Sequence, residues 1–504
     1  MRLTRNRARL VLALVTCALA LAFTASAGAA RFLVVYRSDS IPAGAGAEVR
    51  RAGGTIVARY DAIGIVVAES RDEAFGARIR RDDRVVDLVA RVSADGVAAD
   101  AAAESAGPPS GDLPNDPATD ADTFSALQWN LRMIHAPEAH AITGGSPDVL
   151  VGHIDTGVDF LHADLAPNID FAKSASCVSG EPDPTPAAWN DDSGHGTHTA
   201  GVIAAAANGI GVVGVAPHVG LAEVKASTRI GMRDFFFPDA VVCALVWAGD
   251  NHMDVANMSF SVDRPDQADM LDLWCHSNAA DRAVIKAVQR AAGYARRNGV
   301  TLVAAAGNQG IDLADPPAPY SNECVKLPAE LPGVIGVSSV GAAGEKATTN
   351  GLSSNFGLGV VDVAAPGGDP AQAGPPPANL ILSTWPSSMW APTVLCVPDT
   401  RPAVCPTPAM SPGTVYYRYA AGTSQATAHV SGVAALVVSR FGDFSNPGNG
   451  KLRPGRVEAI LEQTATPHAC PPAPTTCQGG ETHNGWYGHG IVDALAAVTH
   501  DPAA

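Results

Sequence analysis

The sequence has few charged residues, no internal repeat and, beyond residue 29, no long apolar run. Charged residues make up only 17% of its 504 residues, while hydrophobic residues make up 46%. So high an apolar content excludes disorder along the whole chain, and the length is enough for one large domain and a smaller one. No period of roughly 20–50 residues recurs, which argues against solenoids and propellers.

Basic residues are also scarce. The chain has 34 Lys and Arg against 50 Asp and Glu, which gives a formal net charge of −16. A chain this acidic repels phosphate groups. We therefore expect no nucleic-acid partner and no binding to anionic membrane surfaces.

The N-terminus has the pattern of a secretory signal peptide. Four arginines precede an apolar run from Leu10 to Phe23, and small residues follow at 25–29. This order of basic, apolar and small residues predicts a signal peptide over residues 1–29. The apolar run is shorter than the about 20 residues that cross a bilayer, which argues against a stable membrane anchor. Cys17 lies inside that run, so we interpret it as incidental, and we expect a secreted, extracellular protein.

Cysteine usage agrees with export. Eight of the nine cysteines lie beyond the signal peptide, and an even number in an exported chain favours disulfides. Zinc is disfavoured because no C-x-x-C pair is present. The favoured pairs are close in sequence, Cys396 with Cys405 and Cys470 with Cys477. The pairing of the other four stays open: Cys177, Cys243, Cys275 and Cys324.

Residues 31–92 are expected to form a small domain of their own. Strands are predicted at 31–36, 55–60, 63–69 and 85–92, and helices at 46–53 and 70–81. That order, β-α-β-β-α-β, is typical of a ferredoxin-like α+β unit. Residues 93–122 follow, with mostly Ala, Asp, Gly, Pro and Ser, and are expected to be a linker.

The rest of the chain, 125–498, predicts an α/β fold. Continuous apolar strands alternate with helical segments, the pattern of a parallel sheet with helices on both faces. Ligands of such sheets bind outside the carboxyl ends of the strands. The predicted strands are 149–154, 255–260, 301–305 and 334–340, and the predicted helices are 197–207, 281–298 and 424–440.

Three polar residues stand at strand ends or helix starts. Asp155 follows the strand 149–154, His195 opens a helix after Gly194, and Ser424 opens another after Gly422. Each alone has an ordinary structural explanation, as a turn former, a helix-start residue or a helix cap. Together, in the order Asp, His, Ser, they have the chain order of the subtilisin triad.

The sequence resembles the subtilisin-like serine proteases. Three motifs carry the resemblance: Asp155-Thr156-Gly157, His195-Gly196-Thr197-His198-Thr199-Ala200-Gly201 and Gly422-Thr423-Ser424-Gln425-Ala426. Weaker matches run from Leu127 to Val498. The resemblance implies a subtilisin-like fold and a serine endopeptidase that hydrolyses protein or peptide substrates. It also implies that residues 31–92 are an inhibitory pro-domain that the enzyme removes itself.

The resemblance assigns a role to each residue of the site. Ser424 is the expected nucleophile, His195 the general base, and Asp155 the carboxylate that orients the imidazole. The Asn308 side chain and the Ser424 backbone N–H are expected to bind the oxyanion. The small alanines of the expected substrate pocket leave room for a large apolar group. Its expected walls are Ser259, Phe260, Ser261, Ala305, Ala306 and Gly307.

Three positions depart from the family pattern. Gln425 stands where Met is usual, Ala428 where Pro is usual, and Ser261 where Gly is usual. They motivate an alternative, an inactive subtilisin-like domain that serves as a binding scaffold. Since none of the three changes the triad, we expect activity. A lipase or esterase is disfavoured because the nucleophile motif is not G-x-S-x-G.

A structural calcium ion is a further expectation from the resemblance. Its ligands would be Asp164, the Asn208 side chain, and the carbonyls of Ile210 and Val212. All-oxygen ligands suit Ca²⁺. The alternative, that Asn208 and Gly209 simply form a turn, stays open. Zinc is less favoured because no third ligand accompanies His195 and His198, and we expect a monomer.

Overall fold

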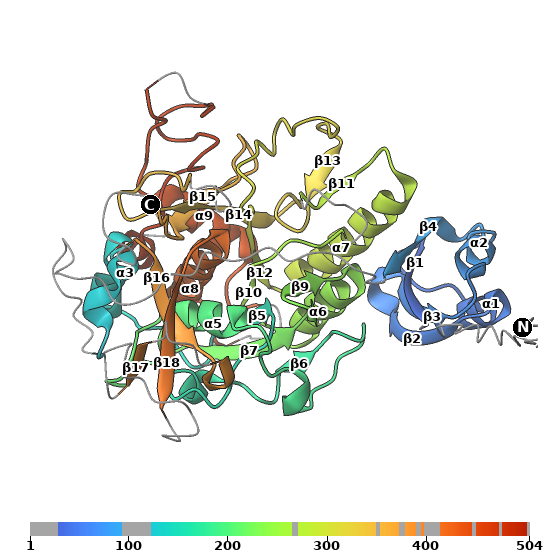
Figure 1. Ribbon diagram of the computed structural model, residues 1–504, viewed down its shortest axis with the longest axis horizontal. Coiled ribbons are helices and arrows are strands. Elements are labelled where there is room, and N and C mark those ends of the chain that lie inside the picture. Colours follow the sequence, from blue (N-terminus) through green and yellow to red (C-terminus); the bar gives the residue numbers. More distant parts are fainter. Residues whose placement is uncertain are drawn as a thin grey trace, which may run out of the picture.

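The computed structural model describes residues 29–92, 122–264, 271–348, 353–371, 379–389, 395–397, 414–445, 450–472 and 476–500. They form an N-terminal unit, residues 29–92, and a larger body, residues 122–500 (Figure 1). The predicted signal peptide up to residue 28 and nearly all of the predicted linker lie outside the described residues. No helix in the described part of the chain is both long and apolar enough to span a bilayer.

The N-terminal unit has the predicted β-α-β-β-α-β order. Its four strands form an antiparallel sheet in the order β2-β3-β1-β4. Helix α2 is shorter than the predicted 70–81, because Ser70 and Asp72 accept the N–H groups of Asp72 and Ala74 in local turns before the helix begins. The elements are β1 Ala30–Tyr36, α1 Ala45–Ala52, β2 Thr55–Tyr60, β3 Ile65–Ser70, α2 Phe75–Ile79 and β4 Val85–Val92.

The body is built on a seven-stranded sheet in which every pair is parallel, as predicted. The strand order is β15-β14-β12-β10-β5-β7-β6, so β5 lies between β10 and β7 near the middle. The strands are β5 Leu150–Asp155, β6 Ala175–Ser176, β7 Gly220–Lys225, β10 Val255–Met258, β12 Thr301–Ala305, β14 Val334–Val340 and β15 Val363–Pro366.

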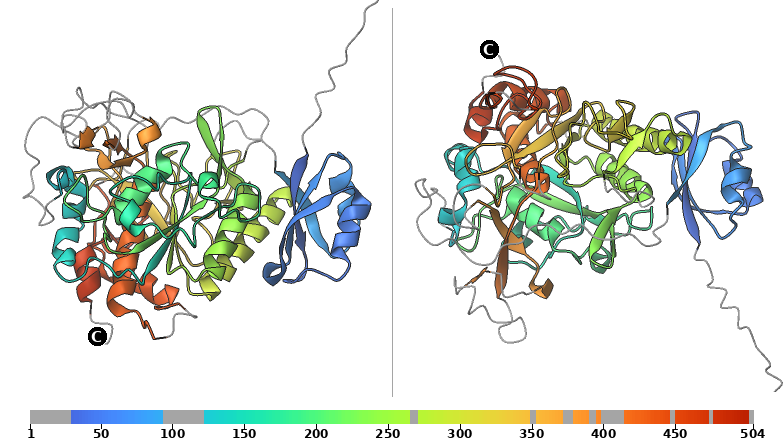
Figure 2. Two further views of the ribbon diagram at one scale, coloured as in Figure 1. Left: turned by 90° about the horizontal axis from the view of Figure 1, so that it is seen from below. Right: turned by 45° about the horizontal axis from the view of Figure 1, so that its top comes forward.

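Helices cover both faces of this sheet (Figures 1 and 2). Along β5, Val151 packs into the core beneath α5 and α8, while Leu150 and Ile154 pack into the core beneath α6 and α7. This alternation is the reason that β5 reads as a continuous apolar run. The helices are α3 Trp129–Met133, α4 Ala136–His140, α5 His195–Ala204, α6 Pro238–Asp250, α7 Ala279–Arg297, α8 Thr423–Phe441, α9 Pro454–Thr464 and α10 Ala494–Thr499.

Three small antiparallel sheets surround the central one, and none of them was predicted. Two are strand pairs, and the third has the order β16-β18-β17. Strand β18 leads directly into α8 and so helps to position its first residues. Their strands are β8 Ser227–Ile230, β9 Arg233–Phe236, β11 Leu273–Cys275, β13 Cys324–Lys326, β16 Ile381–Trp385, β17 Leu395–Val397 and β18 Val415–Ala420.

Disulfides are present in the body, as predicted. Cys470 is bonded to Cys477, which confirms that pair, and the open pairings resolve as Cys177–Cys243 and Cys275–Cys324. Cys396 is also in a disulfide. Cys405, its favoured partner from the sequence, lies outside the described residues.

Candidate active site

Asp155 and His195 meet at the carboxyl end of the central strand. Asp155 is the last residue of β5 and is fully buried, and His195 is the first residue of α5. Gly194, which precedes the helix, has φ of 95°, and a Cβ there would lie 2.3 Å from the Trp385 ring. Only glycine therefore fits where the chain turns His195 toward the sheet.

The Asp155 carboxylate fixes the orientation of the imidazole. Nδ1 of His195 lies 2.6 Å from Oδ1 of Asp155, and the Thr156 N–H donates to the same oxygen at 2.7 Å. The other oxygen, Oδ2, accepts from the Thr199 hydroxyl at 3.2 Å. Because Nδ1 is bound to the carboxylate, the ring presents Nε2 to its other side.

Asp155 and His195 stabilise each other's charged forms. Burial lowers the pKa of His195, but the attraction and hydrogen bond of Asp155 outweigh it and raise that pKa to about 9. Burial likewise raises the pKa of Asp155, but the neighbouring imidazole outweighs it and the pKa is lowered. The carboxylate is therefore ionised wherever His195 titrates.

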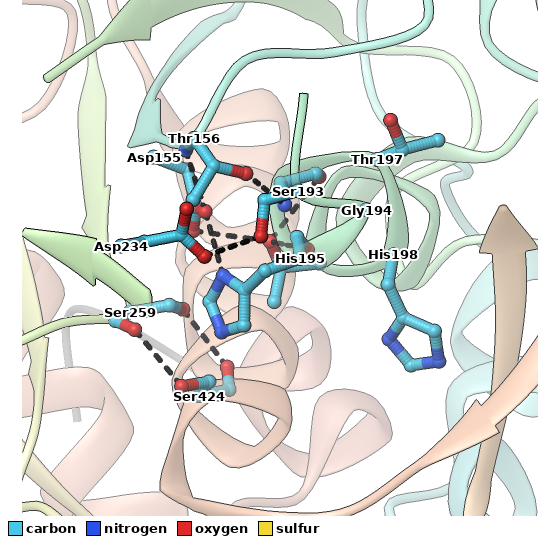
Figure 3. A network of polar contacts seen from close by, with 12 residues as sticks. Asp155, Thr156, Ser193, Gly194, His195, Thr197, His198, Asp234, Ser259 and Ser424 are labelled. Atoms are coloured by element: carbon cyan, nitrogen blue, oxygen red, sulfur yellow. Dashed lines mark hydrogen bonds and ion pairs between the residues drawn. The ribbon is translucent and has the colours of Figure 1, made fainter. Parts of the chain in front are cut away.

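Ser424 lies on the opposite side of the His195 ring from Asp155 (Figure 3). It is the second residue of α8, and its hydroxyl donates to the carbonyl of Ser259 at 2.8 Å. The Ser259 hydroxyl in turn donates to the Ser424 carbonyl at 2.9 Å. Attack on a substrate therefore requires the Ser424 hydroxyl to leave this carbonyl and turn toward Nε2 of His195.

Asn308 lies beside the start of α8, after the end of β12. Its Oδ1 accepts from the Thr423 N–H at 2.9 Å and from the Thr423 hydroxyl at 3.1 Å. With its oxygen held in this way, Nδ2 is the end of the amide that stays available. No hydrogen bond between the described residues uses Nδ2 of Asn308.

Comparison with known proteins agrees with this geometry. The model of the subtilase family, Peptidase_S8, matches residues 146–490, which is more than half of the chain and includes all three residues of the proposed triad. This chain is a subtilase. It is therefore a serine endopeptidase, and its substrates are peptides.

Two bacterial proteases are similar to the subtilase. M-protease from Shouchella clausii is 30% identical over 375 residues, which cover 74% of this chain and 70% of the relative. Subtilisin Savinase from Lederbergia lenta is 30% identical over 375 residues, which cover 74% of this chain and 99% of the relative.

Solved structures show the same fold. The epidermin leader peptide processing serine protease from Staphylococcus aureus superposes with a TM-score of 0.64 at 21% identity, covering 93% of this chain and 98% of that one. Fervidolysin from Fervidobacterium pennivorans superposes with a TM-score of 0.61 at 22% identity, covering 94% of this chain and 61% of that one. Both likenesses extend beyond the family match into the N-terminal part of the subtilase.

The predicted pocket residues line two neighbouring strand ends of the subtilase. Ser259, Phe260 and Ser261 follow β10, and Ala305, Ala306 and Gly307 end or follow β12, which pairs with β10. The Phe260 ring is buried and stacks on Phe236 at 4.1 Å between centroids. Lys326, which the sequence did not point to, lies next to this segment: a Cβ at Gly307 would lie 3.3 Å from its Cε.

The departures from the family pattern do not disturb the residues of the proposed triad. Gln425 is buried, with its Nε2 3.4 Å from Nδ1 of His198. Ala428 is buried within α8, and Ser261 is partly exposed. None of these three side chains makes a hydrogen bond to Asp155, His195 or Ser424 among the described contacts.

Four acidic or basic side chains near the triad were not found from the sequence. Asp191 accepts the backbone N–H groups of Gly194 and Thr197 and so holds the start of α5, and Asp234 accepts from Ser193. His153 and Glu223 lie behind Asp155. A polar residue within an apolar strand was the available signal for His153 and Glu223. Asp191 in a loop and Asp234 in a short strand gave no such signal.

Proposed function

We propose that this subtilase is a secreted endopeptidase that is made as an inactive precursor and matures by cleaving itself. Asp155, His195 and Ser424 would be its catalytic triad, and Asn308 its oxyanion-binding side chain. The observation that carries the proposal is the alignment of the Asp155 carboxylate, the His195 ring and Ser424 at the end of β5. A binding scaffold would not need a buried carboxylate, Asp155, that orients an imidazole, His195, and stabilises its positive charge.

The geometry gives each group one task in peptide hydrolysis. Ser424 Oγ attacks the carbonyl carbon of the peptide bond while Nε2 of His195 takes the hydroxyl proton. The same imidazolium then gives its proton to the leaving amine, and the acyl group stays on Ser424 as an ester. Water, deprotonated by His195 in the same way, releases the acid. Asp155 stabilises the imidazolium throughout and keeps its own charge.

The oxyanion that forms on the attacked carbonyl needs donors that are already in place. Nδ2 of Asn308 and the backbone N–H of Ser424 would supply them, the latter at the positive end of the α8 dipole. Thr423 fixes the Asn308 amide through its Oδ1, so Nδ2 does not have to reorganise as charge develops. This rigidity favours the transition state over the substrate.

The N-terminal unit would be the inhibitory pro-domain, and polar contacts hold it on α6 and α7. Arg31 of β1 forms an ion pair at 3.0 Å with Asp239, a fully buried residue in the first turn of α6. Arg290 of α7 donates to the carbonyls of Tyr36 at 2.8 Å and Ile63 at 3.2 Å. The Tyr60 hydroxyl donates to the Gly180 carbonyl at 2.6 Å.

Apolar side chains of the same sheet face complete this contact. Leu33, Val35, Ile65 and Val67 of the N-terminal unit pack in one continuous core with residues of α6 and α7. The opposite face of the sheet packs under its own helices, α1 and α2. A unit released from the body would expose the first face to water, which favours its docked state.

We expect the protein recovered from the culture medium to begin within residues 93–122. Full-length chain would be expressed in a host that exports proteins but lacks its own secreted proteases, and the product analysed by N-terminal sequencing and intact mass. The linker is the expected cleavage region because its composition offers no packed structure to resist a protease. Protein found only inside the cells would contradict export, and a product that keeps residues 31–92 would contradict maturation.

We also propose that Asp164 and the loop 208–212 bind a structural Ca²⁺ ion. Asp164 is buried, and its Oδ2 accepts from the Val212 N–H at 3.0 Å. Among the described residues no hydrogen bond is formed to its Oδ1, while the Tyr417 hydroxyl and the Asn208 side chain stabilise the carboxylate. Burial raises the pKa of Asp164 to about 7, as expected for a carboxyl without a cation beside it. No hydrogen bond between described residues uses the carbonyls of Ile210 and Val212, so both stay available as ligands.

Asn208 Oδ1 is a less favourable calcium ligand than the two carbonyls. The ion would stabilise the fold and take no part in peptide hydrolysis. Asn208 Oδ1 accepts from the Ile210 N–H at 3.1 Å, so it would share its lone pairs with the ion. No group of three or more His, Cys, Asp or Glu in the described part of the chain could hold a metal. Among the proposed ligands, only Asp164 carries a charge. Bound there, Ca²⁺ would tie the segment after β5 to the loop after α5.

Removing calcium is expected to lower the melting temperature without changing the initial rate at low temperature. A ligand at a hundredfold excess over its Kd stabilises the folded state by about 2.7 kcal/mol. Melting would be measured with excess EGTA and after re-addition of Ca²⁺ or Mg²⁺, which prefers tight octahedral geometry and should rescue poorly. Asp164→Ala should abolish the response, and Asp443→Ala, at an exposed loop, should keep it. A melting temperature that EGTA leaves unchanged would show that the Tyr417 hydroxyl beside Asp164 suffices.

A further inference from the structure

A buried acid–imidazole pair lies directly behind the proposed triad. His153 is in β5, two residues before Asp155, and Glu223 is its partner in the register of the neighbouring strand β7. Both side chains are fully buried. Nδ1 of His153 lies 2.5 Å from Oε2 of Glu223. The mechanism described above uses neither residue.

The other nitrogen of His153 points toward Asp155. Nε2 lies 2.9 Å from the Thr199 hydroxyl of α5 and 3.8 Å from Oδ2 of Asp155. The same Thr199 hydroxyl lies 3.2 Å from Oδ2. The chain of contacts therefore runs from Glu223 through His153 and Thr199 to the carboxylate that orients His195.

The positions of the protons follow from the donors that are available. The Thr199 hydroxyl has one proton, and the ionised carboxylate of Asp155 can only accept. If Thr199 donates to Asp155, its oxygen accepts from Nε2–H of His153, while Nδ1–H donates to Glu223. In that arrangement both ring nitrogens of His153 donate, so the ring is an imidazolium; the Thr199 hydroxyl is also within hydrogen-bond distance of the His195 carbonyl, at 3.1 Å.

The other buried histidines behave differently. Burial lowers the pKa of His198 to about 3 and of His429 to about 4, since their ring nitrogens face backbone carbonyls and amides and no carboxylate bonds to them. Burial also acts to lower the pKa of His153, but Glu223 and Asp155 outweigh it and the pKa is raised. A charged imidazole in the middle of the central strand costs stability, and an apolar residue would pack there more cheaply.

We propose that His153, held by Glu223, is a positioning residue of the active site that fixes the Asp155 carboxylate through the Thr199 hydroxyl and presents a positive charge to it. This inference rests on the proposed roles of Asp155 and His195. His153 does not touch the substrate. It acts on the imidazole of His195 only through Asp155, by orienting Oδ2 and by offsetting part of the negative charge near the triad.

The sign of the effect on His195 follows from the charged groups in this region. Glu223 of β7, Asp155 of β5 and His195 of α5 face His153, and the buried Asp191 acts on both Glu223 and His195. The cation is nearer to the triad than Glu223 is. Removing it, with or without Glu223, leaves the negative charge of Asp155 less compensated, so the His195 imidazolium becomes more stable and its pKa rises.

The test compares four variants of the full-length chain, purified after maturation. His153→Gln and the apolar pair His153→Val with Glu223→Leu should lower kcat roughly ten- to hundredfold, with KM near wild type. In both variants the rise of kcat/KM with pH should shift to a higher pH, by roughly half a unit. Thr199→Val should lower kcat in the same way, and Thr199→Ser, which keeps the hydroxyl, should restore it.

Two controls separate positioning from stability. The apolar pair removes both buried charges together and leaves no unpaired Glu223, although it also removes the acceptor of the Gly157 N–H. If this double variant has the kcat and the pH dependence of wild type, the inference is wrong. His429→Gln removes another fully buried imidazole. It should lower the melting temperature and leave the pH dependence of kcat/KM unchanged. An active His195→Ala variant would refute the proposed triad instead, so the two failures are distinguishable.

Discussion

Replacing Ser424 by alanine is expected to abolish both peptide hydrolysis and maturation. Without Oγ no acyl-enzyme forms, and kcat should fall about a million-fold, as when the nucleophile of subtilisin is removed. The purified variant should keep its N-terminal unit, because the same site would cut the linker. Intact mass and hydrolysis of a peptide substrate measure the two effects on one sample.

Ser439→Ala is the matched control for this experiment. Ser439 is near the other end of the same helix; its hydroxyl donates to the Ala435 carbonyl at 2.8 Å and accepts from the Ser146 N–H at 3.0 Å. This variant should mature and hydrolyse peptides like wild type. If Ser424→Ala is trimmed as completely as wild type in a host without secreted proteases, self-cleavage is wrong.

Asp155→Asn is expected to lower kcat about 10⁴-fold, since the amide stabilises the wrong tautomer of His195 and no longer balances the imidazolium. The pH dependence should change with it. The base must be neutral in the free enzyme, so wild-type kcat/KM should rise with pH through the His195 pKa of about 9. Without the carboxylate, burial dominates and lowers that pKa, so the rising limb of the variant should move to lower pH.

Asp254→Asn gives the comparison for this change. Asp254 is a buried carboxylate that precedes β10, and it pairs with Lys451 at 2.8 Å, away from the triad. Loss of the Asp254 carboxylate should reduce the stability of the fold and leave the pH dependence of kcat/KM as in wild type. A wild-type limb below about pH 4 would contradict a histidine base, because that is the range of an unperturbed carboxyl group.

The elements with strong apolar periodicity were predictable within a few residues. The helix expected at 281–298 is α7, Ala279–Arg297, and the strand expected at 301–305 is β12, Thr301–Ala305. The helix expected at 197–207 begins earlier, at His195, and ends at Ala204. The small sheets were missed because their strands, such as Arg233–Phe236, are too short to show alternation and are stabilised by pairing with distant segments.

The site could be proposed from the sequence where its residues lie in a motif. Glycine beside His195 and Ser424 marked both helix starts, so the triad could be named before its geometry was known. His153 and Glu223 are 70 positions apart and come together only through the register of β5 with β7. No local pattern announces a pair of that kind, because the sheet, and not the sequence neighbourhood, makes the contact.

The wide separation of the triad along the chain has a consequence for synthesis. Asp155 and His195 leave the ribosome well before Ser424, and α8 must also pack against the central sheet before the nucleophile meets the imidazole. Chains grow from the N-terminus and domains fold as units, so a partly made molecule holds an acid and a base but nothing to attack with. Under the proposed roles, the order of synthesis therefore leaves the chain without hydrolase activity until Ser424 and α8 have been made.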